Sequence, residues 1–275
     1  MTDLDAYFAR IGYDGPRDSS LSTLRALHRL HPAAIPFEAI DVLLERGIDI
    51  SPEAVDAKLI HGRRGGYCFE HNSLFARVLT ALGFEVEGLA ARVRWNAPPD
   101  APAQPRTHQL LKVAAGGEDW LVDVGFGGCV LPAPLRFVAD VEQPTDHDTY
   151  RLVPIPGGFA QEVRREAGWV PAYDLSMVPC EPRDYEMANW FTATHPTSPF
   201  RATLMVAATR DEARYGLLFN RLTVRPRDGA PVQTVLDADG LEQTLREVFG
   251  LPVEPAWRPF IEWAAGEGAP VRPAP

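Results

Sequence analysis

The first third of the chain carries apolar residues at intervals of three and four, the spacing that predicts amphipathic helices. Residues 3–11 form the first such segment. A second helix is expected to begin after Ser20, a residue type suited to an N-cap, and to end at His31-Pro32, because the residue before a proline disfavours helix. A short helix is expected over 51–60, where proline occupies the first helical position.

A fourth helical segment, residues 69–82, has its apolar side chains on one face and is ended by Gly83. Gly65-Gly66 lies just ahead of it. This arrangement leaves Cys68 at the start of a buried helix.

From about residue 85 the apolar spacing changes to two, which predicts strands. Turns rich in proline or glycine, such as 97–99 and 115–117, separate these segments. Short antiparallel strands of this kind indicate a small barrel or sandwich. The expected strands are 86–94, 107–113, 120–124 and 150–153.

Beyond Asp184 the pattern is mixed, and a final helix is expected over 241–249, capped by Asp239. We expect the Pro-rich residues 269–275 to fray. No long linker divides the sequence, so its parts are expected to pack together. The remaining expected elements are a helix over 185–191 and strands over 204–208, 216–224 and 232–235.

The composition is that of a globular protein: 275 residues, 45% hydrophobic and 23% charged, with a formal net charge of −10. The only lysines are Lys58 and Lys112, and no basic stripe is present, which argues against a nucleic-acid partner. The N-terminal residues do not resemble a signal peptide, and no apolar run could span a bilayer. Three widely spaced cysteines favour reduced thiols, so a cytoplasmic location is expected, with no membrane partner.

Residues 63–72 are the clearest chemical clue. The thiolate is the nucleophilic form of cysteine, and a helix N-terminus stabilises it, which suits Cys68. Gly65 and Gly66 allow a tight turn and close approach of a substrate, while Arg63 and Arg64 add positive potential. The alternative is that Cys68 is an inert core cysteine. Its position in the sequence alone does not decide between a nucleophile and a core residue.

A second clue is the segment 107–123, which is typical of two strands joined by Gly116-Gly117. With a two-residue loop, Asp123 faces Leu110, and His108 lies on the same sheet face as Asp123, diagonally across the hairpin. Diagonal Cβ atoms are about 7–8 Å apart, within reach of an imidazole and a carboxylate. A loop with an odd number of residues would put them on opposite faces. A histidine–aspartate pair is therefore feasible, although each residue alone is more often structural.

These segments resemble the arylamine N-acetyltransferase family. Residues 64–72 match its Arg-Gly-Gly-x-Cys-x-Glu-x-Asn motif, Thr107-His108 its histidine strand, and residues 123–127 its Asp-Val-Gly-Phe-Gly segment. The resemblance runs from residue 7 to about 206 and more weakly beyond. Further similar segments are 7–13, 35–38 and 189–196.

The resemblance implies an α+β fold in several parts, with a triad arrangement like that of the cysteine proteases. An N-terminal helical bundle would hold Cys68, a central antiparallel β-barrel would hold His108 and Asp123, and a C-terminal α/β lid would follow. The expected parts are 1–85 for the bundle, 86–184 for the barrel, 185–203 for an interdomain helix and loop, and 204–275 for the lid.

The resemblance also implies the chemistry. Acetyl-CoA would acetylate Cys68, and an arylamine, arylhydrazine or arylhydroxylamine would then accept the acetyl group in a ping-pong route, with no permanently bound cofactor and no metal. Glu38 and Arg64 would form a structural ion pair. The substrate-binding residues would be Phe37, Val93, Phe126 and Phe200, and the CoA-binding residues Trp95, Thr107, Phe126, Gly127 and Gly128.

Two related activities stay open at this point: a macrolactam-forming amide synthase of a polyketide pathway, and a thiol amidase or hydrolase using the same triad. A metal site is disfavoured, because His61, Cys68 and His71 lack the paired spacing of a closed zinc centre. Cys129 and Cys180 are interpreted as structural. The physiological amine, the preferred acyl chain and the oligomeric state are left open by the sequence.

Overall fold

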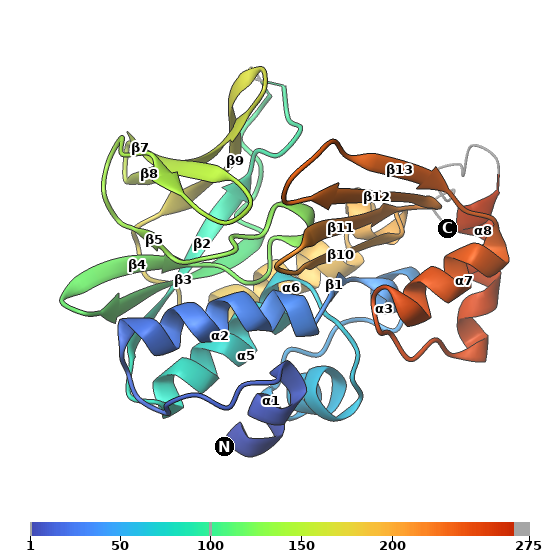
Figure 1. Cartoon of the computed structure of the whole chain (residues 1–275), viewed down its shortest axis with the longest axis horizontal. Coiled ribbons are helices and arrows are strands. Elements are labelled where there is room, and N and C mark those ends of the chain that lie inside the picture. The colour runs from blue at the N-terminus through green and yellow to red at the C-terminus, as the bar shows by residue number, and fades with distance from the viewer. Residues whose placement is uncertain (1, 99–100, 267–275) are drawn as a thin grey trace.

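The computed structural model describes residues 2–98 and 101–266. Helices from the N-terminal third lie along the bottom of Figure 1, a curled antiparallel sheet rises above them on the left, and a second sheet with its helices lies on the right. This is the α+β architecture that the sequence predicts. The segment 269–275, which was expected to fray, lies outside the described residues.

The N-terminal helices begin at the caps that the sequence supplies. Asp3 accepts the Ala6 N–H at the start of α1 (Leu4–Ile11), and Ser20 accepts the Thr23 N–H at the start of α2 (Leu21–Ala34). The predicted end of the second helix at His31-Pro32 is wrong, because the helix continues for two more residues. Proline lacks an N–H, but the Ile35 N–H still reaches the His31 carbonyl at 2.9 Å and closes the last turn.

The segment between α2 and the next long helix is made of short elements. The helix expected over 51–60 is present, but its second half is π-helical. The long helix that follows begins at Cys68 itself. The elements are α3 (Ile40–Leu43), α4 (Pro52–Val55), η1 (Asp56–His61) and α5 (Cys68–Ala81).

Within the described residues the larger sheet has eight strands in the order β5-β4-β3-β2-β9-β8-β7-β6, and it curls towards a barrel (Figure 1). The strands β8 and β9 were not predicted. Pro171 interrupts the apolar alternation of β9 and faces Glu162, where the register shifts, and a bulge is where a sheet accepts proline. The strands are β2 (Glu85–Val93), β3 (His108–Ala115), β4 (Glu118–Val122), β5 (Leu135–Arg136), β6 (Gln143–Pro144), β7 (Thr149–Ile155), β8 (Gly158–Arg165) and β9 (Gly168–Ser176).

The second sheet has the order β1-β10-β11-β12-β13 and packs against the C-terminal helices. The single strand expected over 216–224 is wrong: the chain turns back at Phe219, whose φ is 52°. The cap expected at Asp239 is also wrong, because Asp237 accepts the Gly240 N–H at 2.8 Å instead. The elements are β1 (Phe37–Glu38), α6 (Pro182–Thr194), η3 (Pro199–Arg201), β10 (Met205–Thr209), β11 (Ala213–Leu218), β12 (Arg221–Pro226), β13 (Val232–Val235), α7 (Ala238–Glu247), η4 (Pro255–Trp257) and α8 (Arg258–Ala265).

Strand β1 connects the helical part to the second sheet. Phe37 pairs with Ala207 of β10 on one side and forms a bridge with Gly66 on the other. The Glu38 N–H donates to the Gly66 carbonyl at 2.7 Å. The residues that lead into α5 are therefore held by backbone hydrogen bonds.

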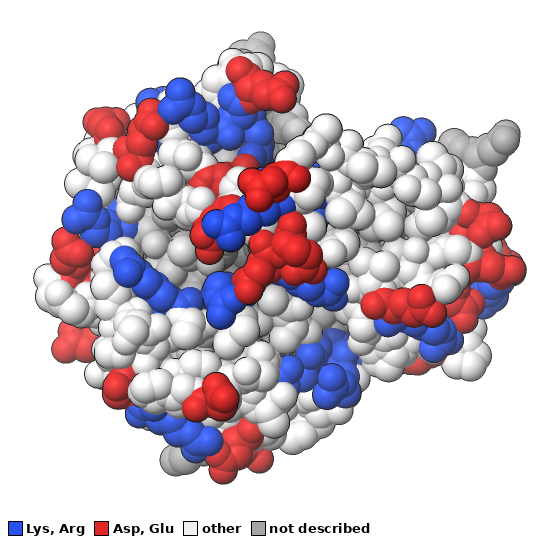
Figure 2. Space-filling view, in the orientation of Figure 1, with Lys and Arg blue, Asp and Glu red and all other residues white. Residues whose placement is uncertain are grey.

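On the face shown in Figure 2, lysines and arginines lie beside aspartates and glutamates, and neither sign forms a broad continuous patch. Among the described residues, no helix is both long and apolar enough to cross a membrane.

The glycine at position 65 permits the contact with β1. A Cβ on Gly65 would lie 2.1 Å from the Pro36 carbonyl oxygen, which is backbone and cannot move aside cheaply. We expect Gly65→Ala to lower the free energy of unfolding by about 1–3 kcal/mol, measured by urea denaturation. The control is Gly216→Ala, because a Cβ there meets no atom within 4 Å. Equal stabilities of the two variants would contradict this account.

Candidate active site

Cys68 is the first residue of α5 and is 5% exposed. Its Sγ lies 3.6 Å from the Thr107 carbonyl oxygen, at the start of β3. Gly125 packs directly on this helix turn, because a Cβ at that position would lie 2.9 Å from the Cys68 Cα. The glycine thus lets the segment after β4 lie against the cysteine.

The hairpin β3–β4 has the two-residue loop on which the sequence argument depended. Ala115 pairs with Glu118, and Leu111 with Val122. The His108 Nε2 lies 2.7 Å from the Asp123 Oδ2, and their side chains are 3% and 0% exposed. The structure therefore brings the two residues into a buried hydrogen-bonded pair.

Asp123 is held at both its carboxylate and its backbone. Oδ1 accepts hydrogen bonds from the Asn72 Nδ2 at 3.1 Å and the Gly125 N–H at 3.0 Å. The backbone N–H of Asp123 donates to the His28 Nε2 at 3.3 Å. Burial alone would raise the pKa of Asp123, but the charge of His108 and these hydrogen bonds hold it below the usual value. The carboxylate is therefore ionised although it is buried.

The pKa of His108 shifts in the opposite direction. Burial opposes its protonation, but the charge of Asp123 and the hydrogen bonds to Asp123 and Cys68 outweigh it and raise the pKa of His108 to about 10. Because Asp123 occupies Nε2, Nδ1 is the nitrogen that remains to exchange a proton. The ring packs against Phe126 and Tyr173, with ring centroids 4.9 and 5.2 Å away.

The residues expected to bind the acceptor fall into two groups around Cys68, His108 and Asp123. Phe37 and Phe200 pack with their centroids 6.1 Å apart, in the same cluster as Cys68. Phe126 lies against His108, and Val93 pairs with Tyr173 across the sheet. A small cavity of about 10 Å³ lies behind Phe37, which is room for about one water.

The residues expected to bind CoA lie on the barrel side. Gly127 packs against Phe37, since a Cβ there would lie 3.3 Å from that ring, whereas Gly128 has open space around it. The Trp95 ring lies under the Arg165 guanidinium, 5.6 Å from its centroid. Thr107 contributes its carbonyl to Cys68.

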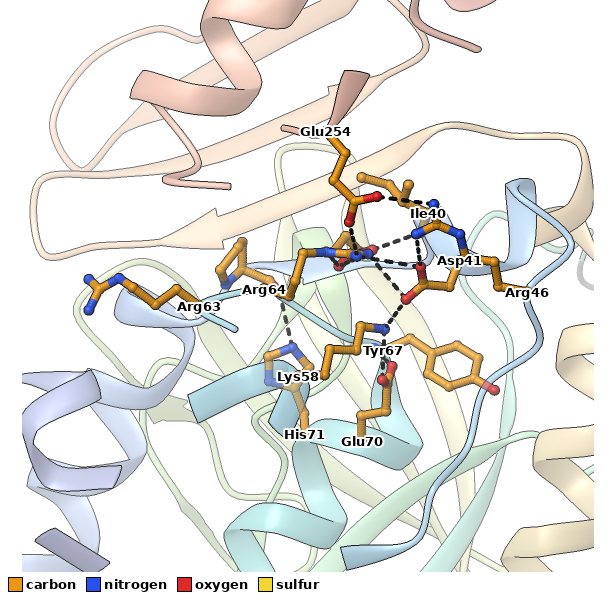
Figure 3. Close-up of polar contacts among 12 residues, drawn as sticks. Ile40, Asp41, Arg46, Lys58, Arg63, Arg64, Tyr67, Glu70, His71 and Glu254 are labelled. Carbon is orange, nitrogen blue, oxygen red and sulfur yellow. Dashed lines mark hydrogen bonds and ion pairs between the residues drawn. The ribbon is translucent and has the colours of Figure 1, made fainter. Parts of the chain in front are cut away.

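A cluster of charged residues lies beside the start of α5 (Figure 3). The Arg64 Nη2 lies 2.8 Å from the Glu38 Oε1 and 3.2 Å from the Asp41 Oδ2. The Arg64 guanidinium also lies 4.6 Å from the centroid of the Trp257 ring, on the C-terminal side of the fold. These contacts tie the residues just before Cys68 to β1, α3 and the C-terminal part of the fold.

Three buried histidines, to which the sequence assigned no role in the site, also lie around it. Besides His28, they are His31 of α2 and His71 of α5, which join in a chain of hydrogen bonds. Burial lowers the pKa of both rings, which are therefore neutral. Because the Pro36 carbonyl accepts from the His71 Nε2, the neutral His71 accepts at Nδ1 from the His31 Nε2, and the His31 Nδ1 accepts from the Tyr7 hydroxyl.

Among the described residues, no group of histidine, cysteine and acidic side chains is arranged to hold a metal ion. Cys129 is buried and Cys180 is partly exposed, and both are free thiols.

Comparison with known proteins identifies the family. The sequence profile of a family described as N-acetyltransferase matches residues 20–258. The arylamine N-acetyltransferase of Mycobacterium tuberculosis is 42% identical over 254 residues, which cover 91% of this chain and 90% of that protein. The chain belongs to the arylamine N-acetyltransferase family.

Two further relatives agree with this assignment. The arylamine N-acetyltransferase / N-hydroxyarylamine O-acetyltransferase of Salmonella typhimurium is 38% identical over 94% of this chain and 92% of its own. The solved structure of the Mycobacterium marinum arylamine N-acetyltransferase in complex with CoA has a TM-score of 0.90 at 39% identity, and it covers 96% of this chain and 99% of that one. The protein is thus an enzyme of the acetyltransferase class.

The buried histidines make stability depend on pH. Burial lowers the pKa of His28 and of His71 to about 4, and lowers that of His31 well below its usual value. The unfolded chain binds these protons near pH 6.5 and the folded chain does not, so stability is lost as the pH falls below 6.5. His28 and His71 should each remove about 2 kcal/mol between pH 7.5 and 5, and His31 acts in the same direction. His108 offsets about 1 kcal/mol of this loss of stability. Because its pKa is raised in the folded state, its contribution to stability grows as the pH falls from 7.5 and is fully present below 6.5.

The test is urea denaturation at pH 7.5 and at pH 5. His28→Gln keeps an acceptor for the Asp123 N–H but does not titrate, so its loss of stability over this range should be smaller than that of the wild type by about 2 kcal/mol. An identical pH dependence in both proteins would show that His28 is not held neutral in the fold.

Proposed function

We propose that this enzyme transfers an acetyl group from acetyl-CoA to the nitrogen of arylamines or arylhydrazines, and to arylhydroxylamines, through an acetyl-Cys68 thioester. The observation that carries the proposal is the buried His108–Asp123 pair beside the Cys68 thiol. The CoA complex of the M. marinum relative supports the donor, and the name of the S. typhimurium relative supports hydroxylated amines as acceptors.

The first half-reaction uses Cys68 as a thiolate paired with the His108 imidazolium. The thiolate attacks the carbonyl carbon of acetyl-CoA, and the tetrahedral intermediate collapses with breakage of the bond to the CoA sulfur. CoA leaves as a thiolate and takes a proton from the His108 Nδ1. The products are free CoA, neutral His108 and acetyl-Cys68.

The second half-reaction returns the enzyme to its starting state. Acetylation removes the charge on Cys68 that helped to hold the proton on His108, so the imidazole is now available as a base. The amine nitrogen attacks the thioester, His108 accepts its proton, and Cys68 leaves as a thiolate. General acid–base catalysis of this kind contributes about 10²–10⁴-fold.

The first turn of α5 supplies the stabilisation of the oxyanion. The N–H groups at a helix start have no acceptor within the helix, and Cys68 is the first helical residue. Its own N–H therefore serves as a donor to the developing negative oxygen, an interaction worth about 10²–10³-fold in comparable sites.

We assign the acceptor ring to the apolar surface formed by Phe37, Val93, Phe126 and Phe200. We assign the CoA arm to Trp95, Thr107, Phe126, Gly127 and Gly128; the open space at Gly128 favours close approach there. The amide-synthase and hydrolase alternatives have no support among the relatives described above, whose names are all those of acetyltransferases.

The intermediate gives a direct test by intact-protein mass spectrometry after brief incubation with acetyl-CoA. The wild type should gain the mass of one acetyl group and lose it when an arylamine is added, whereas Cys68→Ala should gain none. Cys129→Ala and Cys180→Ala are matched controls that should still be acetylated. Acetylation of Cys68→Ala, or none of the wild type, would remove the proposed intermediate.

Asp123→Asn tests the role of the carboxylate. Without this charge the main influence that raises the pKa of His108 is lost, so the imidazolium–thiolate pair should be less populated near neutral pH. We expect kcat/KM to fall by about 10³–10⁴-fold and the pH profile of Cys68 alkylation to move to higher pH. An unchanged alkylation profile would show that Asp123 does not influence the ionisation of Cys68 and would contradict its proposed role.

A further inference from the structure

Glu70 lies in the first turn of α5, the helix that begins at Cys68. It is the third residue of α5, it is 1% exposed, and its Oε2 accepts the backbone N–H of Tyr67 at 3.0 Å. A Cβ on Gly66 would lie 2.8 Å from this oxygen, so the glycine provides the space for the carboxylate. Glu70 therefore satisfies a backbone donor at the point where the chain enters the helix at Cys68.

Lys58 approaches the other oxygen of this carboxylate. Its Nζ lies 2.8 Å from the Glu70 Oε1 and 2.8 Å from the Asp41 Oδ2, and Figure 3 shows the ammonium between the two. Burial opposes its charge, yet the three carboxylates of Glu70, Glu38 and Asp41 hold the pKa of Lys58 above its ordinary value. The ammonium is charged.

The other charged groups of the cluster also have partners of opposite charge, and Asp41, which contacts Lys58, lies 3.2 Å from Arg64 as well. Arg64 lies 2.8 Å from Glu38, and Arg46 lies 3.0 Å from Glu254. His71, the next residue on α5, is neutral because burial lowers its pKa to about 4.

Glu70 and Lys58 therefore place a carboxylate and an ammonium in contact at the first turn of α5. On the opposite side of Cys68 lie His108 and Asp123, which are already paired with each other.

The two charges act on a thiolate in opposite directions. A carboxylate in the first helical turn disfavours a second negative charge, while an ammonium beside it favours one. Because Lys58 and Glu70 are in contact, their effects nearly cancel. The helix start thus keeps a strong acceptor for the Tyr67 N–H without placing a net negative charge near the thiol.

We propose that Glu70 and Lys58 are positioning residues for the nucleophile: Glu70 holds the first turn of α5 in place, and Lys58 cancels the charge that this carboxylate would otherwise impose on the Cys68 thiolate. The proposal rests on Cys68 being the nucleophile of the function proposed above.

The pH profile of Cys68 alkylation by iodoacetamide, followed by mass spectrometry of the peptide containing Cys68, tests this proposal. Glu70→Gln keeps a hydrogen-bond acceptor of the same shape but removes one of the two carboxylates that contact Lys58. The charge beside the start of α5 becomes more positive by one unit, so the midpoint of the profile should fall by about 0.5–1 pH unit. Adding Lys58→Met in the Glu70→Gln background removes that excess charge. The midpoint should then return to about 0.2 pH unit or less from that of the wild type.

Lys112, the other lysine of the chain, provides the matched control. It lies on the β3–β4 hairpin, 3.5 Å from Asp119 and 3.8 Å from Glu87. Lys112→Met in the Glu70→Gln background removes the same charge from a different place and should leave the lowered midpoint unchanged. Restoration by Lys112→Met would show an effect of net charge alone and would overturn the proposal.

A profile of Glu70→Gln that coincides with that of the wild type would also overturn it, because the pair would then have only a structural role. If Glu70→Gln does not fold, judged by circular dichroism, Lys58→Met and Lys58→Arg replace it: the first should raise the midpoint and the second should not, and equal midpoints would refute the proposal. Alkylation needs no acetyl-CoA. Failure of the acetylation experiment therefore removes the proposed function, whereas an unchanged profile in an enzyme that does acetylate removes only this inference.

Discussion

The buried hydrogen bond between His108 and Asp123 is the interaction on which the rest of the site depends. A carboxylate removed from water is costly unless it is paired, and the fold meets this condition with His108, the Asn72 amide and the Gly125 N–H. Asn72 belongs to α5, so the same contact that stabilises the carboxylate also ties the hairpin to the helix that begins at Cys68. The position of the thiol relative to the imidazole therefore follows from the need to satisfy one buried charge.

The second constraint is that main-chain segments must lie very close to one another around the site. Glycines provide the space for this close contact. Gly125 lets the segment after β4 lie on the first turn of α5, while Gly65 lets the chain pass beside the Pro36 carbonyl. In both places the nearest atoms that a Cβ would meet include backbone, the Cys68 Cα at Gly125 and the Pro36 carbonyl at Gly65, which cannot rotate away as a side chain can. A Cys-His-Asp site built from a helix and a hairpin therefore requires close contact between main chains as well as the three side chains.

Local patterns in the sequence were sufficient to predict the elements that carry Cys68, His108 and Asp123. The two-residue loop at Gly116-Gly117 determines the register of β3 and β4, and this register alone places His108 and Asp123 on one face. Strand β9 escaped prediction because Pro171, at a bulge, breaks its alternation. Tyr173, which packs on His108, lies on this strand. His28 was missed for another reason: it lies among apolar residues of α2, and only the tertiary contact with the Asp123 N–H gives it a polar partner.

The histidines around the site show how one residue type takes opposite roles in the same core. His28 and His108 are both buried, and both interact with Asp123. His28 receives the backbone N–H, a donor that requires an unprotonated nitrogen, and burial lowers its pKa to about 4. His108 faces the carboxylate, whose charge outweighs burial and raises its pKa to about 10. His28 meets the backbone N–H of Asp123, whereas His108 meets its carboxylate. The orientation of this one aspartate therefore decides which histidine carries a proton and which stays neutral.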